Sequence, residues 1–287
     1  MAQKIATGLF QFCEYTIGEA AVTTGVQTGG DLTINPQPRQ RNGIGGTSIR
    51  RGGLIVPSGN AEFYLTATNL TLLTAGLRAS YPKGALTGLD ISGGMNAWSR
   101  DYGGAVIEEF GLNYSRDEGL KANVKWGALS VAEGAGGTQA AVTDLDFEDH
   151  DFTITVGGKS IGVSNVEIKG KNNVSWRSNG DAKVAGSIRM PTHCVYGLEE
   201  LTVDITADLP FAIADLGLLE DDLPDNLGCV LTGSNGVSVC TITLTNLMPG
   251  ENSHGYVDAN TAADYKQSFI GDPAAGSLAI AITAEAA

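Results

Sequence analysis

Short runs in which apolar and polar residues alternate cover much of this chain and predict strands. Between residues 120 and 128 every second residue is apolar, and the residues between them are mostly polar. A period of two places one set of side chains in a core and the other in solvent. The turn at Ser115–Gly119 joins this run to an earlier apolar run at 105–115, which predicts a hairpin.

Similar patterns recur from one end of the chain to the other, separated by glycine-rich turns. The expected strands are two within 54–77, then 105–115, 120–131, 152–156, 159–163, 165–168, 181–190, 201–208, 227–231, 237–244 and 277–283. Residues 1–20 fit an arm or an edge strand. Helices are expected only at 70–73 and at 210–219, the latter being the one substantial helix. The predicted fold class is therefore all-β with few short helices.

A glycine–strand–proline pattern occurs twice, about half the chain apart. Gly52–Pro57 reads GGLIVP and Gly186–Pro191 reads GSIRMP, and each leads into an alternating run, at 62–66 and at 201–205. Repetition of a whole supersecondary unit indicates one fold used twice. The small-residue stretch 132–140 is the expected boundary. We therefore predict two tandem β-sandwich or barrel domains, at 1–135 and 136–287.

Residues 25–53 form an unusually long connection rich in Gly, Thr, Asn, Pro and Arg. This segment is expected to be an extended loop or long hairpin rather than core, and such lengths usually mark a functional segment. It contains Arg39, Arg41, Arg50 and Arg51. As a DNA contact the cluster is weak, because no aromatic residues lie between the arginines. Contact with another subunit is a better interpretation, and solvated loop charges without a partner are the alternative.

Acidic partners for such a contact lie elsewhere in the sequence. The candidate residues are Asp144, Asp146, Glu148, Asp149, Glu220, Asp221 and Asp222.

The charge balance argues against a protein that binds nucleic acid through its phosphates. The chain has 287 residues, with Lys+Arg 18 against Asp+Glu 32 and a net charge of −14. Phosphate binding depends on cationic side chains that displace counterions. The acidity serves solubility, or it lets a polyanion slide past without sticking. No leader or apolar stretch of about 20 residues is seen, so we expect the chain in a cytoplasm and not in a membrane.

Candidate chemistry is sparse. His150, His193 and His254 share no ligand spacing, and no nucleophile elbow, phosphate loop or metalloprotease motif is present. The carboxylates of 144–151 could meet a hard cation, although a solvated acidic turn is the better interpretation. We expect the four cysteines to be reduced, with a Cys229–Cys240 bridge as a minor alternative. The sequence thus predicts no enzyme, no cofactor and no metal.

The order of features resembles that of siphophage tail tube (major tail) proteins. The segments that carry the resemblance are 42–57, 106–114 turning into 119–127, the hairpin 154–161 followed by 166–168, and 185–188 leading to 201–203. The resemblance spans most of the chain, roughly residues 20–285. The family makes tube-like β domains whose sheets join across subunits into rings, and the rings stack into a hollow tube. The long loop, here 25–53, would reach the neighbouring ring.

The resemblance also implies partners and a location. Three two-domain chains would form a ring with pseudo-sixfold symmetry, which the repeat favours; a hexamer of single-domain subunits is the other arrangement. The tube would enclose a tape-measure protein, meet tail terminator and distal tail proteins, and let genomic DNA pass without specific binding. The protein would be part of a virion tail assembled in the host cytoplasm. A capsid decoration or receptor-binding module is the alternative, and a β-sandwich hydrolase is a third interpretation.

Overall fold

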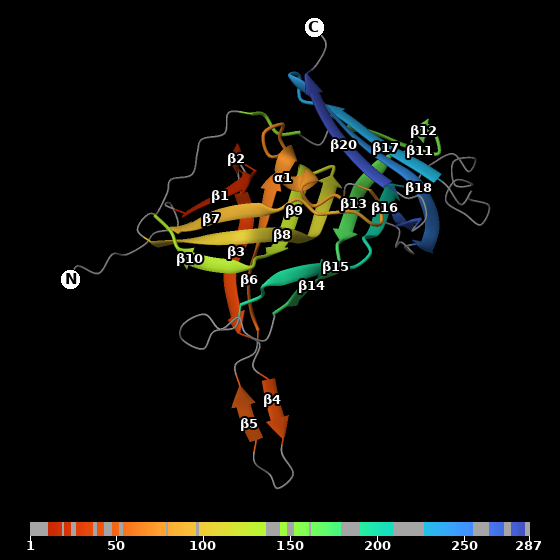
Figure 1. The fold of residues 1–287 in the computed structure, drawn as a ribbon. Helices are drawn as coiled ribbons and strands as arrows, with labels where there is room; N and C mark the ends of the chain where they lie inside the picture. Colours follow the sequence, from red (N-terminus) through yellow and green to blue (C-terminus); the bar gives the residue numbers. More distant parts are fainter. Residues whose placement is uncertain are drawn as a thin grey trace.

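Strands dominate the computed structural model, which describes residues 11–18, 20–23, 27–36, 39–42, 48–51, 54–78, 80–95, 98–135, 144–147, 152–160, 162–178, 190–208, 227–254, 264–272 and 277–284. The first half contains β1 (Gln11–Ile17), β2 (Ala20–Thr23), β3 (Gln27–Pro36), β4 (Arg39–Asn42), β5 (Ser48–Arg51), β6 (Ile55–Tyr64), α1 (Leu70–Thr74), β7 (Leu89–Met95), β8 (Trp98–Ser115), β9 (Gly119–Gly127) and β10 (Ser130–Glu133). The second half contains β11 (Phe152–Val156), β12 (Lys159–Ser160), β13 (Val163–Lys171), β14 (Val174–Arg177), β15 (His193–Tyr196), β16 (Glu200–Asp208), β17 (Leu227–Ser234), β18 (Ser238–His254), β19 (Asp264–Gly271) and β20 (Ser277–Ala284). The all-β class is confirmed (Figure 1).

One antiparallel sheet, here called the main sheet, runs through both halves of the chain. Its strand order is β3-β6-β9-β8-β13-β16-β19-β18. Along β6, Ala61 and Phe63 are buried and Asn60 and Glu62 are exposed. This alternation gives the main sheet a core face and a polar face.

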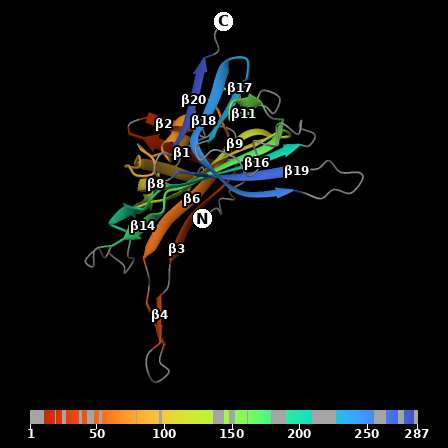
Figure 2. The same cartoon turned by 90° about the vertical axis from the view of Figure 1, so that its right-hand side faces the viewer.

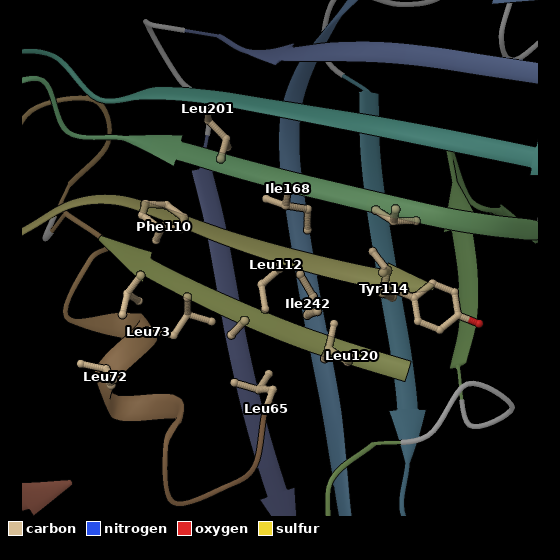
Figure 3. Close-up of a cluster of buried hydrophobic side chains, with 14 of the residues drawn as sticks. Leu65, Leu72, Leu73, Phe110, Leu112, Tyr114, Leu120, Ile168, Leu201 and Ile242 are labelled. Carbon is tan, nitrogen blue, oxygen red and sulfur yellow. The ribbon is translucent and has the colours of Figure 1, made fainter. Parts of the chain in front are cut away.

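Two long strands leave the main sheet and enter smaller sheets that cover its core face. The first half of β8 pairs with β7 and β10, and the first half of β18 pairs with β17 and β20. Figure 3 shows Leu112, Leu120 and Ile242 between the main-sheet strands β8 and β9 and the first half of β18. All three are buried. The β-bulges in both long strands fit these bends, because a bulge bends a strand and increases its twist.

The connectivity of the first half is repeated in the second half. The first-half pairings are β1–β2, β1–β7, β3–β6, β6–β9, β7–β8, β8–β9 and β8–β10. The second-half pairings, in the same order, are β11–β12, β11–β17, β13–β16, β16–β19, β17–β18, β18–β19 and β18–β20. Each half also inserts a two-stranded hairpin, β4–β5 or β14–β15, between its first two main-sheet strands. The two halves therefore have the same topology.

Register irregularities fix which residues correspond. One shift lies after Gln27 in β3 and after Val163 in β13, and a second lies after Leu89 in β7 and after Leu227 in β17. A third lies after Ile107 in β8 and after Pro249 in β18. With these matched, Trp126 corresponds to Phe269, and both are fully buried. Three coincident bulges make this alignment specific, because bulges are conserved structural features.

The same alignment corrects the repeat inferred from the sequence. Phe63 corresponds to Ala207, so Glu62 corresponds to Thr206 and not to Leu201. The sequence-level match of 62–66 with 201–205 is therefore out of register. The second copy of the glycine pattern, at 186–189, lies outside the described residues.

The halves join through antiparallel pairing of β8 with β13, and one cluster of buried side chains contains residues from both. The division into domains at 1–135 and 136–287 stays a prediction.

Several expected elements are confirmed, and others are corrected. The hairpin at 115–119, the short helix near 70 and the hairpin at 152–163 are present, although the second strand of the last is only Lys159–Ser160. Residues 11–17 form β1, which pairs with β2 and β7. The segment 25–53 is partly core, because β3 belongs to the main sheet and Leu32 packs on the buried cluster. Within 54–77 the structure has one strand, not two. The expected helix 210–219 and most of the strand 181–190 lie outside the described residues.

Candidate assembly site

The junction between the halves is a continuous strand pair with a filled core side. Leu112 of β8 lies opposite Ile168 of β13, and each is 1% exposed. Phe110 lies opposite Gly170, where an added Cβ would stand 2.0 Å from the Phe110 ring. Glycine is therefore needed there because the ring occupies the space of a side chain. On the other face, Asn165 donates from Nδ2 to Asn113 Oδ1 at 3.0 Å.

Asn172, directly after β13, joins two separate segments of the first half, 76–78 and 107–108. Its Nδ2 donates to the carbonyl oxygens of Gly76 at 2.8 Å and Ile107 at 3.0 Å. Its backbone N–H donates to Glu108 O at 2.8 Å. Arg78 donates from Nε to Asn172 Oδ1 at 3.0 Å. The side chain is fully buried, and its hydrogen-bonding capacity is used, as burial of an amide requires.

Arg78 also faces a buried carboxylate from the second half. Its Nε lies 4.0 Å from Glu199 Oε2, and the two side chains are 2% and 4% exposed. Burial raises the pKa of the Glu199 carboxyl, and the Arg78 charge partly offsets that shift. Burial likewise lowers the pKa of Arg78, against the effect of Glu199. Desolvation is therefore the largest influence on the pKa of both groups.

The hairpin β14–β15 covers part of the first half beside this junction. Trp176 donates from Nε1 to Glu108 Oε1 at 2.5 Å. An added Cβ on Gly127 would lie 2.6 Å from Trp176 Cζ2, so the indole lies directly over that glycine. A shallow polar cleft of about 240 Å³ lies alongside, lined by Glu108, Glu109, Lys171, Asn173, Val174 and Ser175. Glu109 in this cleft also pairs with Lys125.

The main sheet ends in two open edges. Within the described residues, β3 pairs only with β6, and residues 248–254 of β18 pair only with β19. β3 is the counterpart of β13, and the second half of β18 is the counterpart of the second half of β8. The two open edges therefore correspond to the two strands that pair inside the chain. Open edges carry unpaired backbone donors and acceptors and favour strand addition.

An exposed apolar residue lies next to one of these edges. Ile270 of β19 is 47% exposed and corresponds to Gly127 of β9. Gly127 is covered by Trp176, whereas within the described residues Ile270 has no equivalent cover. The position that Trp176 covers at the internal junction, Gly127, thus has an exposed counterpart, Ile270, next to the open edge.

The arginine cluster lies on the hairpin β4–β5. Arg39 lies opposite Arg51, Gln40 opposite Arg50, and Arg41 opposite Ile49. Figures 1 and 2 show this hairpin projecting away from the main body. The structure therefore places all four arginine positions on one hairpin, as the long-hairpin interpretation of 25–53 predicts.

The expected acidic partners are described only in part. Asp144 is exposed, and its Oδ2 accepts hydrogen bonds from the backbone N–H of Thr68 at 2.9 Å and from the Thr68 hydroxyl. Asp144 is therefore already engaged within its own chain. Asp146 is exposed, whereas Glu148, Asp149, Glu220, Asp221 and Asp222 lie outside the described residues.

The polar face of the main sheet carries charges of both signs. Lys125 contacts Glu109 at 3.2 Å across β9 and β8, and Lys169 contacts Glu167 at 2.8 Å on β13. Each of these side chains is at least 40% exposed. Such exposed pairs contribute little to stability, but they balance charge locally. The net acidity of the chain is therefore not concentrated along these strands.

The part of the chain that the structure describes holds no cluster of three or more metal-binding side chains. His193 is exposed on β15, and its Nδ1 lies 3.1 Å from the Thr192 hydroxyl. His150 lies outside the described residues. Nor do the described residues include a helix long and apolar enough to cross a membrane.

Cys194, Cys229 and Cys240 are free thiols. Cys229 lies opposite Leu244 and Cys240 lies opposite Gly233, so the two cysteines do not face each other. Burial raises the pKa of each of these thiols to about 12.

A scan of the chain against protein-family models found no match, and a search of curated proteins found no significant match. Function is therefore inferred from the sheet edges, the charge pattern and the resemblance of the sequence.

Proposed function

We propose that this chain is a structural subunit that assembles with copies of itself into rings, and that the rings stack into a hollow tube. The observation that carries this proposal is the relationship between the open edges and the internal junction. Within the part of the chain that the structure describes, β3 and the second half of β18 are open, and their counterparts β13 and β8 pair with each other. A second copy therefore offers each open edge a strand equivalent to one that already pairs in this fold.

Ring closure follows from the type of contact. β3 and β18 are different surfaces, so pairing between them is heterologous, and a repeated heterologous contact makes a ring or an open filament. A ring leaves no main-sheet edge exposed, which removes the aggregation hazard of open strands. Three chains with two topologically equal halves each would form a pseudo-sixfold wall, with a hexamer as the other arrangement.

The lumen of such a ring would be lined by the polar face of the main sheet. The core face carries the smaller sheets and α1, and this bulk fits the outside of a curved wall, where there is more room. The polar face carries paired lysines and carboxylates, such as Lys125 with Glu109. A lining without a run of unpaired cations would let a polyanion move without binding.

Together with the resemblance in sequence, these features support the tail tube of a long-tailed, non-contractile bacteriophage. Its partners would be a tape-measure protein in the lumen and terminator and distal tail proteins at the tube ends. Genomic DNA would pass through on ejection, and the chain would catalyse no reaction.

Negative-stain electron microscopy of the purified chain, over a range of concentrations, tests this proposal. Rings with a central hole, or tubes built from them, are the expected result. A chain that stays monomeric at high concentration would contradict it and would favour a capsid decoration or receptor-binding module, which would not polymerise alone.

A further inference from the structure

We infer that β18 of one copy pairs with β3 of the next in one defined register, the register that β8 and β13 use inside the chain. This inference rests on the proposed self-assembly and names the strands and residue pairs that form its contact. Inside the chain, Gly111 of β8 lies opposite Lys169 of β13. Gly111 corresponds to Ser253, because their partners, Asn123 and Lys266, each lie three positions before the matched residues Trp126 and Phe269.

The partner position follows in the same way. Lys169 lies opposite Thr202 of β16, and Thr202 corresponds to Ser58 of β6. Ser58 lies opposite Thr33 of β3, so Thr33 is the counterpart of Lys169. The inferred contact therefore places Ser253 of one copy opposite Thr33 of the next.

The neighbouring pairs follow by continuing the antiparallel register. His254 would lie opposite Leu32, Asn252 opposite Ile34, and Glu251 opposite Asn35. Ile34 replaces Gly170 of the internal junction, and Asn252 replaces the large Phe110. The size difference across the pair is thus reversed: the larger residue moves from the β8 side to the β3 side.

Ile270 gives separate support from outside the edge strands. At the internal junction its counterpart Gly127 is covered by Trp176, from the hairpin that follows β13. The inferred register brings the segment after β3 of the next copy toward Ile270. That contact would bury an apolar side chain that is 47% exposed in the single chain.

Disulfide trapping tests the register directly. Opposed residues in antiparallel strands have Cα atoms about 4.5 or 5.5 Å apart, within the range that a disulfide accepts. The variant Thr33→Cys with Ser253→Cys should form covalent oligomers under mild oxidation, seen as loss of the monomer band on a non-reducing gel. Mixing the two single variants should give covalent dimers and nothing larger, because each chain then carries only one of the two introduced cysteines.

A register control keeps the chemistry and moves one cysteine. Asp31→Cys with Ser253→Cys uses another exposed position of β3, two residues from Thr33. Diagonal neighbours lie about 7–8 Å apart, beyond the usual disulfide range. This variant should cross-link much more slowly. The unaltered chain and each single variant alone set the background from Cys13, Cys194, Cys229 and Cys240.

Ile270→Asp adds a readout that needs no new cysteine. It should prevent ring formation while leaving the unfolding midpoint of the monomer unchanged, because the side chain is half exposed. Val237→Asp, at a 62% exposed turn position away from both edges, is the matched control and should still form rings.

The outcomes separate the register from the proposed function. Rings that form without the Thr33–Ser253 cross-link, or that cross-link equally well through Asp31, would overturn the register and leave the proposed function standing. Neither rings nor cross-links at any concentration would overturn both.

Discussion

Arg78 donates two hydrogen bonds to Asn172, the residue directly after β13. One runs from Nε to Asn172 Oδ1 at 3.0 Å, and the other from Nη2 to Asn172 O at 2.6 Å. Arg78 follows α1 in the first half, and Asn172 follows β13 in the second. The counterpart of Asn172 at the open edge is Pro36, which has no backbone N–H and no amide. The junction inside the chain is therefore stabilised by side-chain hydrogen bonds of Asn172 that Pro36 cannot make at the proposed junction between chains. One contact would be permanent, and the other would form on assembly.

Replacing Asn172 with alanine should destabilise the monomer strongly. The change leaves the carbonyl oxygens of Gly76 and Ile107 and the Arg78 Nε without their partner in a buried place. Unsatisfied buried groups of this kind give an expected loss of about 2–4 kcal/mol in the free energy of unfolding. Urea denaturation measures it. Asn123→Ala, on the exposed face of β9, should change stability by less than about 0.5 kcal/mol. Equal effects of the two changes would contradict the role given to Asn172.

Glu199 should make stability depend on pH in a defined direction. Burial raises the pKa of its carboxyl in the folded chain above the ordinary value of 4.5. The folded state therefore holds the proton more tightly than the unfolded state. This contribution to stability is fully present below pH 4.5 and is lost as the pH rises through the folded-state pKa.

Glu199→Gln removes that proton equilibrium. As the pH rises above 4.5, the free energy of unfolding of the original chain should fall relative to that of this variant. Urea denaturation at a series of pH values gives the slope. A difference that does not vary with pH would show that Glu199 titrates as it does in the unfolded chain.

Cys229 and Cys240 should resist thiol reagents in the folded chain. Burial raises the pKa of both thiols to about 12, so almost no thiolate is present at pH 8, and the thiolate is the reactive form. Maleimide labelling followed by peptide mass spectrometry should modify the half-exposed Cys194 first. Labelling of Cys229 or Cys240 should begin only in denaturant. Rapid labelling of either in native buffer would contradict their burial.

The arginines Arg50 and Arg51 of the hairpin β4–β5 should act in stacking rings. Arg50→Glu with Arg51→Glu reverses two charges on β5, which lies outside the main sheet. We expect single rings to persist while tubes become shorter, since the reversed charges would repel acidic groups of the adjacent ring. Tube length by negative-stain microscopy gives the result, with Lys83→Glu as an exposed charge reversal elsewhere. Tubes of original length in the Arg50/Arg51 variant would refute the stacking role.

Local features of the fold could be predicted from the sequence because their signals are local. The turn at 115–119 lies between two apolar runs, and the structure places β8 and β9 on either side of it. The short helix expected at 70–73 is likewise present, as α1. β7 was missed because Gly93 and Gly94 interrupt its alternation, and β19 because Lys266 and Gln267 hide its pattern. Gln267 is nevertheless buried beside Phe269.

The assembly site was less accessible to sequence reasoning. The repeat was seen, but its alignment followed a glycine–proline pattern, whereas the true register is set by β-bulges that the sequence does not display. Asn172 gave no signal, because a buried amide and a surface amide look alike in a sequence. The open edges depend on which strands remain without a partner after folding. That property belongs to the whole sheet rather than to any one segment.

The most direct measurement is an electron cryomicroscopy reconstruction of the assembled chain, viewed in cross-section. We expect a closed wall in which the two halves of each chain alternate around a hollow centre. The main sheet should run without a break from β18 of one copy into β3 of the next. A wall in which those two edges face solvent, or an assembly in which copies meet through other surfaces, would contradict it.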